Sequence, residues 1–190
     1  MAEIGRDLLA INEAYDIENM YLTFDVQGEE YAVNIAYVTE IVGLQRISAV
    51  PDVPGFIKGV INLRGRVIPV MDMRLRFGLP WHEYGDRTPI IVLELDDPST
   101  GSGQVPTGLV VDQVTDVVSI SPENIAPPPR WQGVDEQGGT VIKGLGRRDD
   151  GVSIVVDVPR LLSAQDVRLD LPLEVDEALT TAGETVAEGN

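Results

Sequence analysis

Residues 51–74 read P-D-V-P-G-F-I-K-G-V-I-N-L-R-G-R-V-I-P-V-M-D-M-R and predict two short strands joined by a tight corner. Asn62 can hydrogen-bond the local backbone of such a corner, and Gly65 permits a left-handed backbone conformation there. Arg64 would then project from a rigid turn, which suits its guanidinium to a bidentate contact with a carboxylate of a partner. The alternative is an ordinary hairpin whose arginine is only solvated.

The pattern of this stretch returns later in the chain. Residues 57–75 align with residues 142–160 at a constant offset of 85, with six identities in 19 pairs. Upstream, V-T-E-I-V at 38–42 resembles V-T-D-V-V at 114–118. The sequence therefore predicts two similar β units of about 75 residues each, which are too small to bury much alone and should share apolar surface.

Strand signals dominate the rest of the chain. Residues 21–34 predict a hairpin in which Leu22, Phe24 and Val26 share one face. The further predicted strands are short, rich in β-branched residues and bounded by turn residues; they cover 57–63, 66–71, 88–95, 107–112, 114–120, 140–145 and 152–157. This spacing predicts an all-β barrel or sandwich.

Helix signals are weak. Asn34 and Asp72 can each cap a short turn, and Pro159 suits the first turn of a short helix. Residues 1–19 are expected to form an N-terminal arm, either helical or frayed. Residues 166–190 hold seven acids, one base and no aromatic residue, so we expect an acidic tail that does not pack into the core.

The composition excludes several classes of function. The 190 residues contain no cysteine and one histidine, which excludes thiol chemistry and sites built from His pairs, and no cofactor or metal is expected. The formal charge is −17, from 14 basic and 31 acidic residues, which opposes nucleic-acid binding. The sequence shows no membrane-spanning run and no secretory signal, so we expect a soluble cytoplasmic protein.

Basic residues concentrate in the middle of this acidic chain. Five of the 14 bases fall within 19 residues that hold a single acid, and they are Lys58, Arg64, Arg66, Arg74 and Arg76. Such a segment either offers a basic surface to an acidic partner or is a strand with solvated arginines.

Two candidate reaction sites are weaker. Asp96 and Asp97 end a strand and resemble the acidic pair of a phospho-receiver domain, but the alternating helices of that fold are not predicted. His82 would support a hydrolase only if a serine converged on it, and no Ser-containing nucleophile elbow occurs in the chain.

The segment F-I-K-G-V-I-N-L-R-G-R-V-I-P-V-M-D-M-R resembles the signature of the CheW-like domain family. The resemblance extends from about residue 20 to 164 and includes V-T-E-I-V and G-L-V-V-D-Q-V-T-D-V-V-S-I. It implies two SH3-like five-stranded β-barrel subdomains, over about 20–85 and 86–165, packed on a shared hydrophobic core. It also implies a non-enzymatic adaptor of bacterial chemotaxis.

The resemblance further implies the partners of the chain. These are the cytoplasmic hairpin tip of chemoreceptors, the regulatory domain of the histidine kinase CheA and other copies of the adaptor in an array, so that the protein would be recruited to membrane-associated receptor clusters. The family's motifs place partner contacts at Val38, Glu40, Ile41, Lys58, Gly59, Asn62, Arg64, Gly65, Val114 and Val117. An adaptor of a non-motility array, controlling pili or development, is the alternative.

Overall fold

The computed structural model describes residues 17–96, 104–128 and 141–163. Its strands are β1 (Met20–Val26), β2 (Glu29–Asn34), β3 (Val38–Gly43), β4 (Ile57–Leu63), β5 (Arg66–Asp72), β6 (Pro89–Asp96), β7 (Gln104–Val110), β8 (Gln113–Ser119), β9 (Ile125–Ala126), β10 (Ile142–Arg148) and β11 (Gly151–Val156). Its helical segments are short: η2 (Ile17–Asn19), η3 (Ile35–Tyr37), α2 (Met73–Arg76), η4 (Pro122–Asn124) and α3 (Val158–Ser163). The prediction of an all-β fold with few short helices is confirmed. The acidic tail and most of the N-terminal arm lie outside the described residues.

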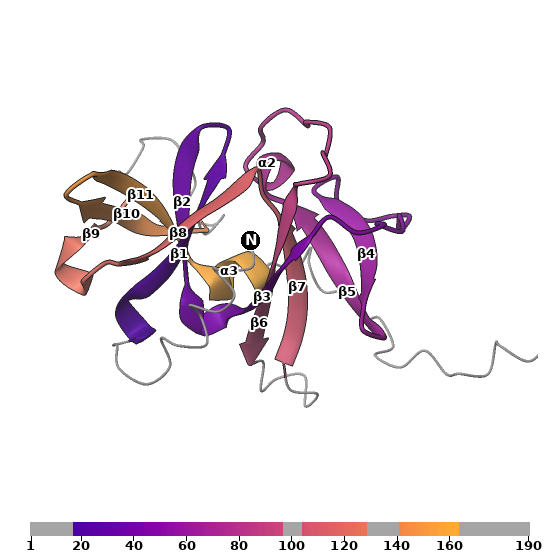
Figure 1. Ribbon diagram of the computed structural model, residues 1–190, viewed down its shortest axis with the longest axis horizontal. Coiled ribbons are helices and arrows are strands. Elements are labelled where there is room, and N and C mark those ends of the chain that lie inside the picture. The colour runs from indigo at the N-terminus through magenta and orange to yellow at the C-terminus, as the bar shows by residue number, and fades with distance from the viewer. Residues whose placement is uncertain (1–16, 97–103, 129–140, 164–190) are drawn as a thin grey trace, which may run out of the picture.

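The strands form two sheets that lie side by side, with α3 between them (Figure 1). One sheet has the order β8-β1-β2-β11-β10-β9, and the other has the order β3-β6-β7-β5-β4. The two orders follow one plan, in which an edge strand is followed by two hairpins. The edge strand is β8 in the first sheet and β3 in the second, and the hairpins are β1–β2 and β10–β11 in the first and β6–β7 and β4–β5 in the second. In both sheets the hairpins meet in a parallel pair, β2 with β11 and β7 with β5.

The five-stranded sheet is a contiguous stretch of chain from β3 to β7, inserted between β2 and β8 of the other sheet. The chain crosses between the sheets at η3 and at Val111–Asp112. A boundary near residue 85, as the family resemblance implies, would fall between β5 and β6, inside the five-stranded sheet. The repeat marks equivalent strands correctly, but it does not show which neighbouring hairpin each strand pairs with.

The repeated Ile-Lys-Gly motif has the same structural role in both sheets. At Gly59, a Cβ atom would lie 2.0 Å from the carbonyl oxygen of Ser48, and at Gly144 it would lie 2.4 Å from that of Ala126. Ser48 forms a bridge with Val60, and Ala126 of β9 pairs with Leu145. At each site a second backbone closes over the edge of the sheet, and only glycine leaves room for it.

The core has three parts. The largest cluster lies between the sheets and takes side chains from both, including Leu22, Phe24, Met71 and Leu93, and from α3, which contributes Leu161. On the same strands, the residues that alternate with these point away from the shared core and into the interior of their own sheet. The five-stranded sheet encloses a cluster around Ile61, Ile68 and Ile90, and the six-stranded sheet encloses one around Tyr21, Ile120 and Val155. The expected shared apolar surface is therefore the main core of the molecule.

Candidate functional site

The corner between β4 and β5 has the geometry that the sequence predicts. Arg64 has φ 53° and Gly65 has φ 86°, so both lie in the left-handed region. The side-chain oxygen Oδ1 of Asn62 accepts a hydrogen bond of 2.8 Å from the backbone N–H of Gly65. This bond closes the turn locally, so the direction in which Arg64 projects is fixed by its own corner.

Arg64 meets an acidic partner within the chain. Its Nη1 and Nη2 atoms donate to Oε1 and Oε2 of Glu40 at 2.9 and 2.8 Å, which is a bidentate ion pair. The Arg64 side chain is 76% exposed, whereas that of Glu40 is 26% exposed. Two residues that were predicted separately as partner contacts therefore form one unit, which presents the guanidinium to solvent in a fixed orientation.

A second arginine lies next to this pair. Arg66, the first residue of β5, donates to Glu94 of β6 at 3.0 Å and is 58% exposed. Glu40 and Glu94 stand on β3 and β6, which are neighbours in the sheet. We call Arg64, Arg66, Glu40 and Glu94 the basic corner, because its two cations are much more exposed than its two acids.

The other predicted residues of this region differ in exposure. Lys58 is partly exposed on β4. Gly59 is buried beneath the backbone of Ser48, so it offers little surface to a partner, and closure of the sheet explains its identity.

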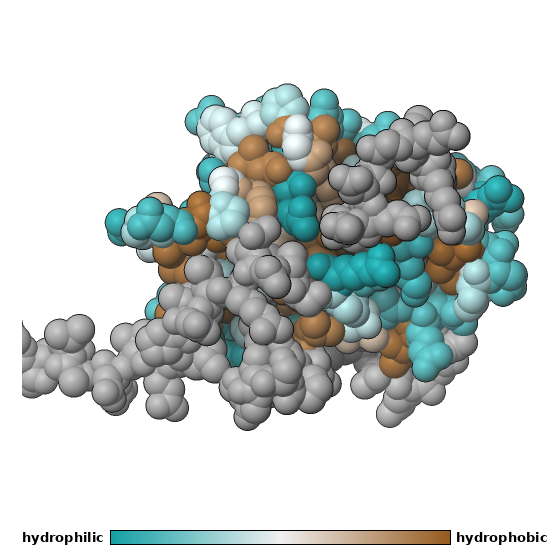
Figure 2. Space-filling model, turned by 180° about the vertical axis from the view of Figure 1, so that it is seen from behind, coloured by the Kyte–Doolittle hydropathy of each residue, from teal (hydrophilic) through white to brown (hydrophobic). Residues whose placement is uncertain are grey.

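The predicted apolar contacts lie on the edge strands β3 and β8. Val38 and Ile41 of β3 and Val114 and Val117 of β8 are partly buried and pack against the shared core. The two pairs occupy equivalent positions of the repeat, since each lies on the first strand of its sheet order. Seen from behind in Figure 2, hydrophobic side chains are exposed in several small areas among hydrophilic ones, between the grey segments.

Sequence reasoning missed one strong polar contact, at the crossover between the sheets. Arg74 of α2 donates from Nε and Nη2 to the two oxygens of Asp112, at 2.7 and 2.6 Å. The backbone N–H of Gln27, in the β1–β2 turn, donates to Asp112 at 2.7 Å. Burial alone would raise the pKa of Asp112, but the hydrogen bonds from Arg74 and Gln27 outweigh it and hold that pKa below its usual value. Asp112 thus ties the two sheets together where the chain passes between them.

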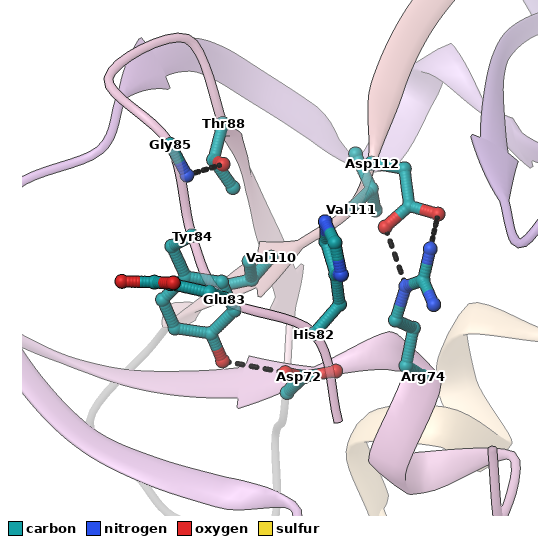
Figure 3. A pocket seen from close by; sticks show the side chains of 10 residues that line it. All are labelled: Asp72, Arg74, His82, Glu83, Tyr84, Gly85, Thr88, Val110, Val111 and Asp112. Carbon is teal, nitrogen blue, oxygen red and sulfur yellow. Dashed lines mark hydrogen bonds and ion pairs between the residues drawn. The ribbon is translucent and has the colours of Figure 1, made fainter. Parts of the chain in front are cut away.

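Arg74 and Asp112 also border a cavity of about 210 Å³ (Figure 3). It is lined by Asp72, Arg74, His82, Glu83, Tyr84, Gly85, Thr88, Val110, Val111 and Asp112. Tyr84 donates from its hydroxyl to the buried carboxylate of Asp72 at 2.5 Å, and burial together with this bond raises the pKa of Tyr84. Among the described residues, no serine lines this cavity beside His82, so the arrangement that the hydrolase alternative requires is not seen in this part of the chain.

The described ranges contain neither a metal-binding cluster nor a membrane-spanning helix. No three His, Cys, Asp or Glu side chains in these ranges are grouped so that they could hold a metal ion. Among the same residues, no helix has the length and apolar character needed to cross a membrane.

Comparison with known proteins gives the family. Residues 20–166 match the model of the CheW-like domain. The chain belongs to the CheW-like domain family. The chemotaxis protein CheW of Klebsiella aerogenes is 36% identical over 78% of this chain and 84% of its own length. The CheW of Bacillus subtilis is 31% identical over 80% of this chain and 91% of its own.

A solved structure agrees with this assignment. The crystal structure of the scaffolding protein TtCheW from Thermoanaerobacter tengcongensis superimposes with a TM-score of 0.65 at 31% identity, covering 78% of this chain and 95% of that one. Membership of the CheW-like family confirms the prediction of a non-enzymatic chemotaxis adaptor.

Proposed function

We propose that this CheW-like adaptor couples the cytoplasmic hairpin tip of chemoreceptors to the regulatory domain of the histidine kinase CheA. The observation that carries the proposal is the exposed Arg64, held by Glu40 and by a left-handed turn at one edge of the five-stranded sheet. A guanidinium fixed in this way loses little conformational freedom when it binds a carboxylate, so it suits recognition of an acidic helical surface. Lys58 and Asn62 would extend the same contact.

The kinase would dock on the edge strands. Val114 and Val117 of β8 lie on an edge strand and are partly buried, so a homologous sheet of the kinase could cover them. Val38 and Ile41 offer the equivalent position on β3, which other copies of the adaptor would use in an array. The protein would then act in the cytoplasm, recruited to membrane-associated receptor clusters.

The proposal is tested by reversing the charge at the corner. We expect Arg64→Glu to weaken co-purification with tagged receptor at least several-fold, because the substituted side chain repels both Glu40 and the receptor's acids. Circular dichroism should show an unchanged fold, since Arg64 is 76% exposed. Arg147→Glu is the matched control, because it makes the same charge change at an exposed residue of β10. Equal receptor binding by wild type, Arg64→Glu and Arg147→Glu would remove the corner from the mechanism.

A further inference from the structure

The two sheets of this chain differ in charge although they share one plan. The part that carries the five-stranded sheet, residues 38–96 and 104–111, holds seven acids and seven bases. The described remainder, which carries the six-stranded sheet, holds ten acids and four bases. The part with the six-stranded sheet therefore repels an acidic segment, whereas the part with the five-stranded sheet, the balanced half, carries no net charge.

Within the balanced half, exposure favours the cations. Arg64 and Arg66 are 76% and 58% exposed, whereas their acidic partners Glu40 and Glu94 are 26% and 12% exposed. Arg64 gives two N–H groups to Glu40 and Arg66 gives one to Glu94, while a guanidinium has five. The basic corner can therefore accept further carboxylates without breaking its own ion pairs.

The chain itself supplies a suitable acidic segment. Residues 166–190 carry seven acids against one base. They follow α3, which packs against β6, the strand that holds Glu94 in the basic corner. A segment of this length spans at most about 80 Å, and attachment to the same chain gives it a millimolar effective concentration at a site within reach.

We propose that the acidic tail, residues 166–190, docks on the basic corner of its own chain and competes there with acidic partners. The contact is electrostatic and exposed, so it is weak, reversible and sensitive to salt. It would set a threshold that an acidic helical partner must exceed before it occupies Arg64. Only this competition rests on the proposed function; the docking itself does not.

The docking can be measured on the full chain without any partner. The chain has no cysteine, so Thr180→Cys provides a single attachment point for a nitroxide spin label. We expect paramagnetic broadening of the amide signals of residues 62–66 at low salt, and its loss in about 0.5 M NaCl, where the Debye length falls to a few ångströms. The double substitution Arg64→Gln and Arg66→Gln should abolish the broadening, and Arg147→Gln should leave it intact. Absent broadening, or broadening centred on the six-stranded sheet, would overturn the proposal.

The competition has a separate readout. Replacing the seven tail acids by Asn and Gln should raise affinity for the tagged receptor tip by on the order of threefold at low salt, with no gain at high salt. If the spin label reports docking but this affinity is unchanged, the tail binds the corner without competing, and that part of the inference is wrong. If receptor binding is undetectable in both chains, the proposed function fails while the docking result stands.

Discussion

Gly59 is a residue whose identity is set by a backbone that crosses it. Its φ of 135° lies outside the range that side chains tolerate well, and the carbonyl of Ser48 occupies the place of a Cβ atom. The N–H and C=O groups of Ser48 and Val60 exchange hydrogen bonds of 2.8 and 2.9 Å across this contact. The motif match pointed to a partner contact at Gly59, whereas the structure explains the glycine by closure of the five-stranded sheet.

We therefore expect Gly59→Ala to lower the free energy of unfolding by about 2–4 kcal/mol, because neither backbone can move without breaking the bridge. Urea denaturation followed by circular dichroism measures this. Gly55→Ala is the matched control, since nothing lies within 4 Å of its Cβ position, and it should change stability by less than about 1 kcal/mol. Equal stability of the two variants would show that the crossing segment adapts freely.

At the scale of elements, Asp112 joins α2 to the β1–β2 turn through contacts that persist only while its carboxylate is ionised. Folding lowers the pKa of Asp112 from its ordinary value of 3.8. The interaction therefore contributes its full stability above pH 3.8, and this contribution is lost as the pH falls below 3.8 through the lower pKa of the folded state. We expect Asp112→Asn to cost about 1–2 kcal/mol at pH 7, after allowing for partial exposure. The cost should shrink as the pH approaches 3, which urea denaturation at a series of pH values would reveal.

Asp150 provides the comparison for this pH series. It also accepts two hydrogen bonds from one arginine, Arg148, but within a single hairpin and with 74% of its side chain exposed. Asp150→Asn should change stability by less than about 0.5 kcal/mol at pH 7. A cost for Asp112→Asn that stays constant from pH 7 to pH 3 would contradict an electrostatic origin.

Local sequence signals predicted the strands and helix caps better than the contacts that these elements make with one another. The strand expected at 57–63 matches β4 in both bounds, and the caps at Asn34 and Asp72 accept backbone N–H groups as expected. The strand pattern did not predict β3, because this edge strand is only partly buried and lacks a clear alternation of buried and exposed residues. The Arg64–Glu40 and Arg74–Asp112 pairs could not be predicted, since they join residues 24 and 38 positions apart that meet only when the sheets close.

At the scale of the whole molecule, one sheet is inserted into the other along the chain. The six-stranded sheet needs β1 and β2 from before the insertion and β8 to β11 from after it. The shared core takes buried residues from both parts, so neither sheet covers that apolar surface without the other.

This topology makes a prediction about dividing the chain at Gly85, which lies in an exposed loop. A fragment ending there keeps β3, β4 and β5 but loses β6 and β7, which stand between β3 and β5 in the sheet. Its β1–β2 hairpin also loses both neighbouring strands, β8 and β11. We expect each fragment alone to show no cooperative thermal unfolding, because its strands lack their hydrogen-bonding neighbours and its core residues are exposed. Mixing the fragments should restore a single transition.

A full chain carrying a protease site at residue 85 and cleaved after folding is the control for the cut itself, and it should keep a cooperative transition. Cooperative unfolding of residues 86–190 alone would mean that the second half of the repeat forms its own core, and that the inserted topology does not govern folding.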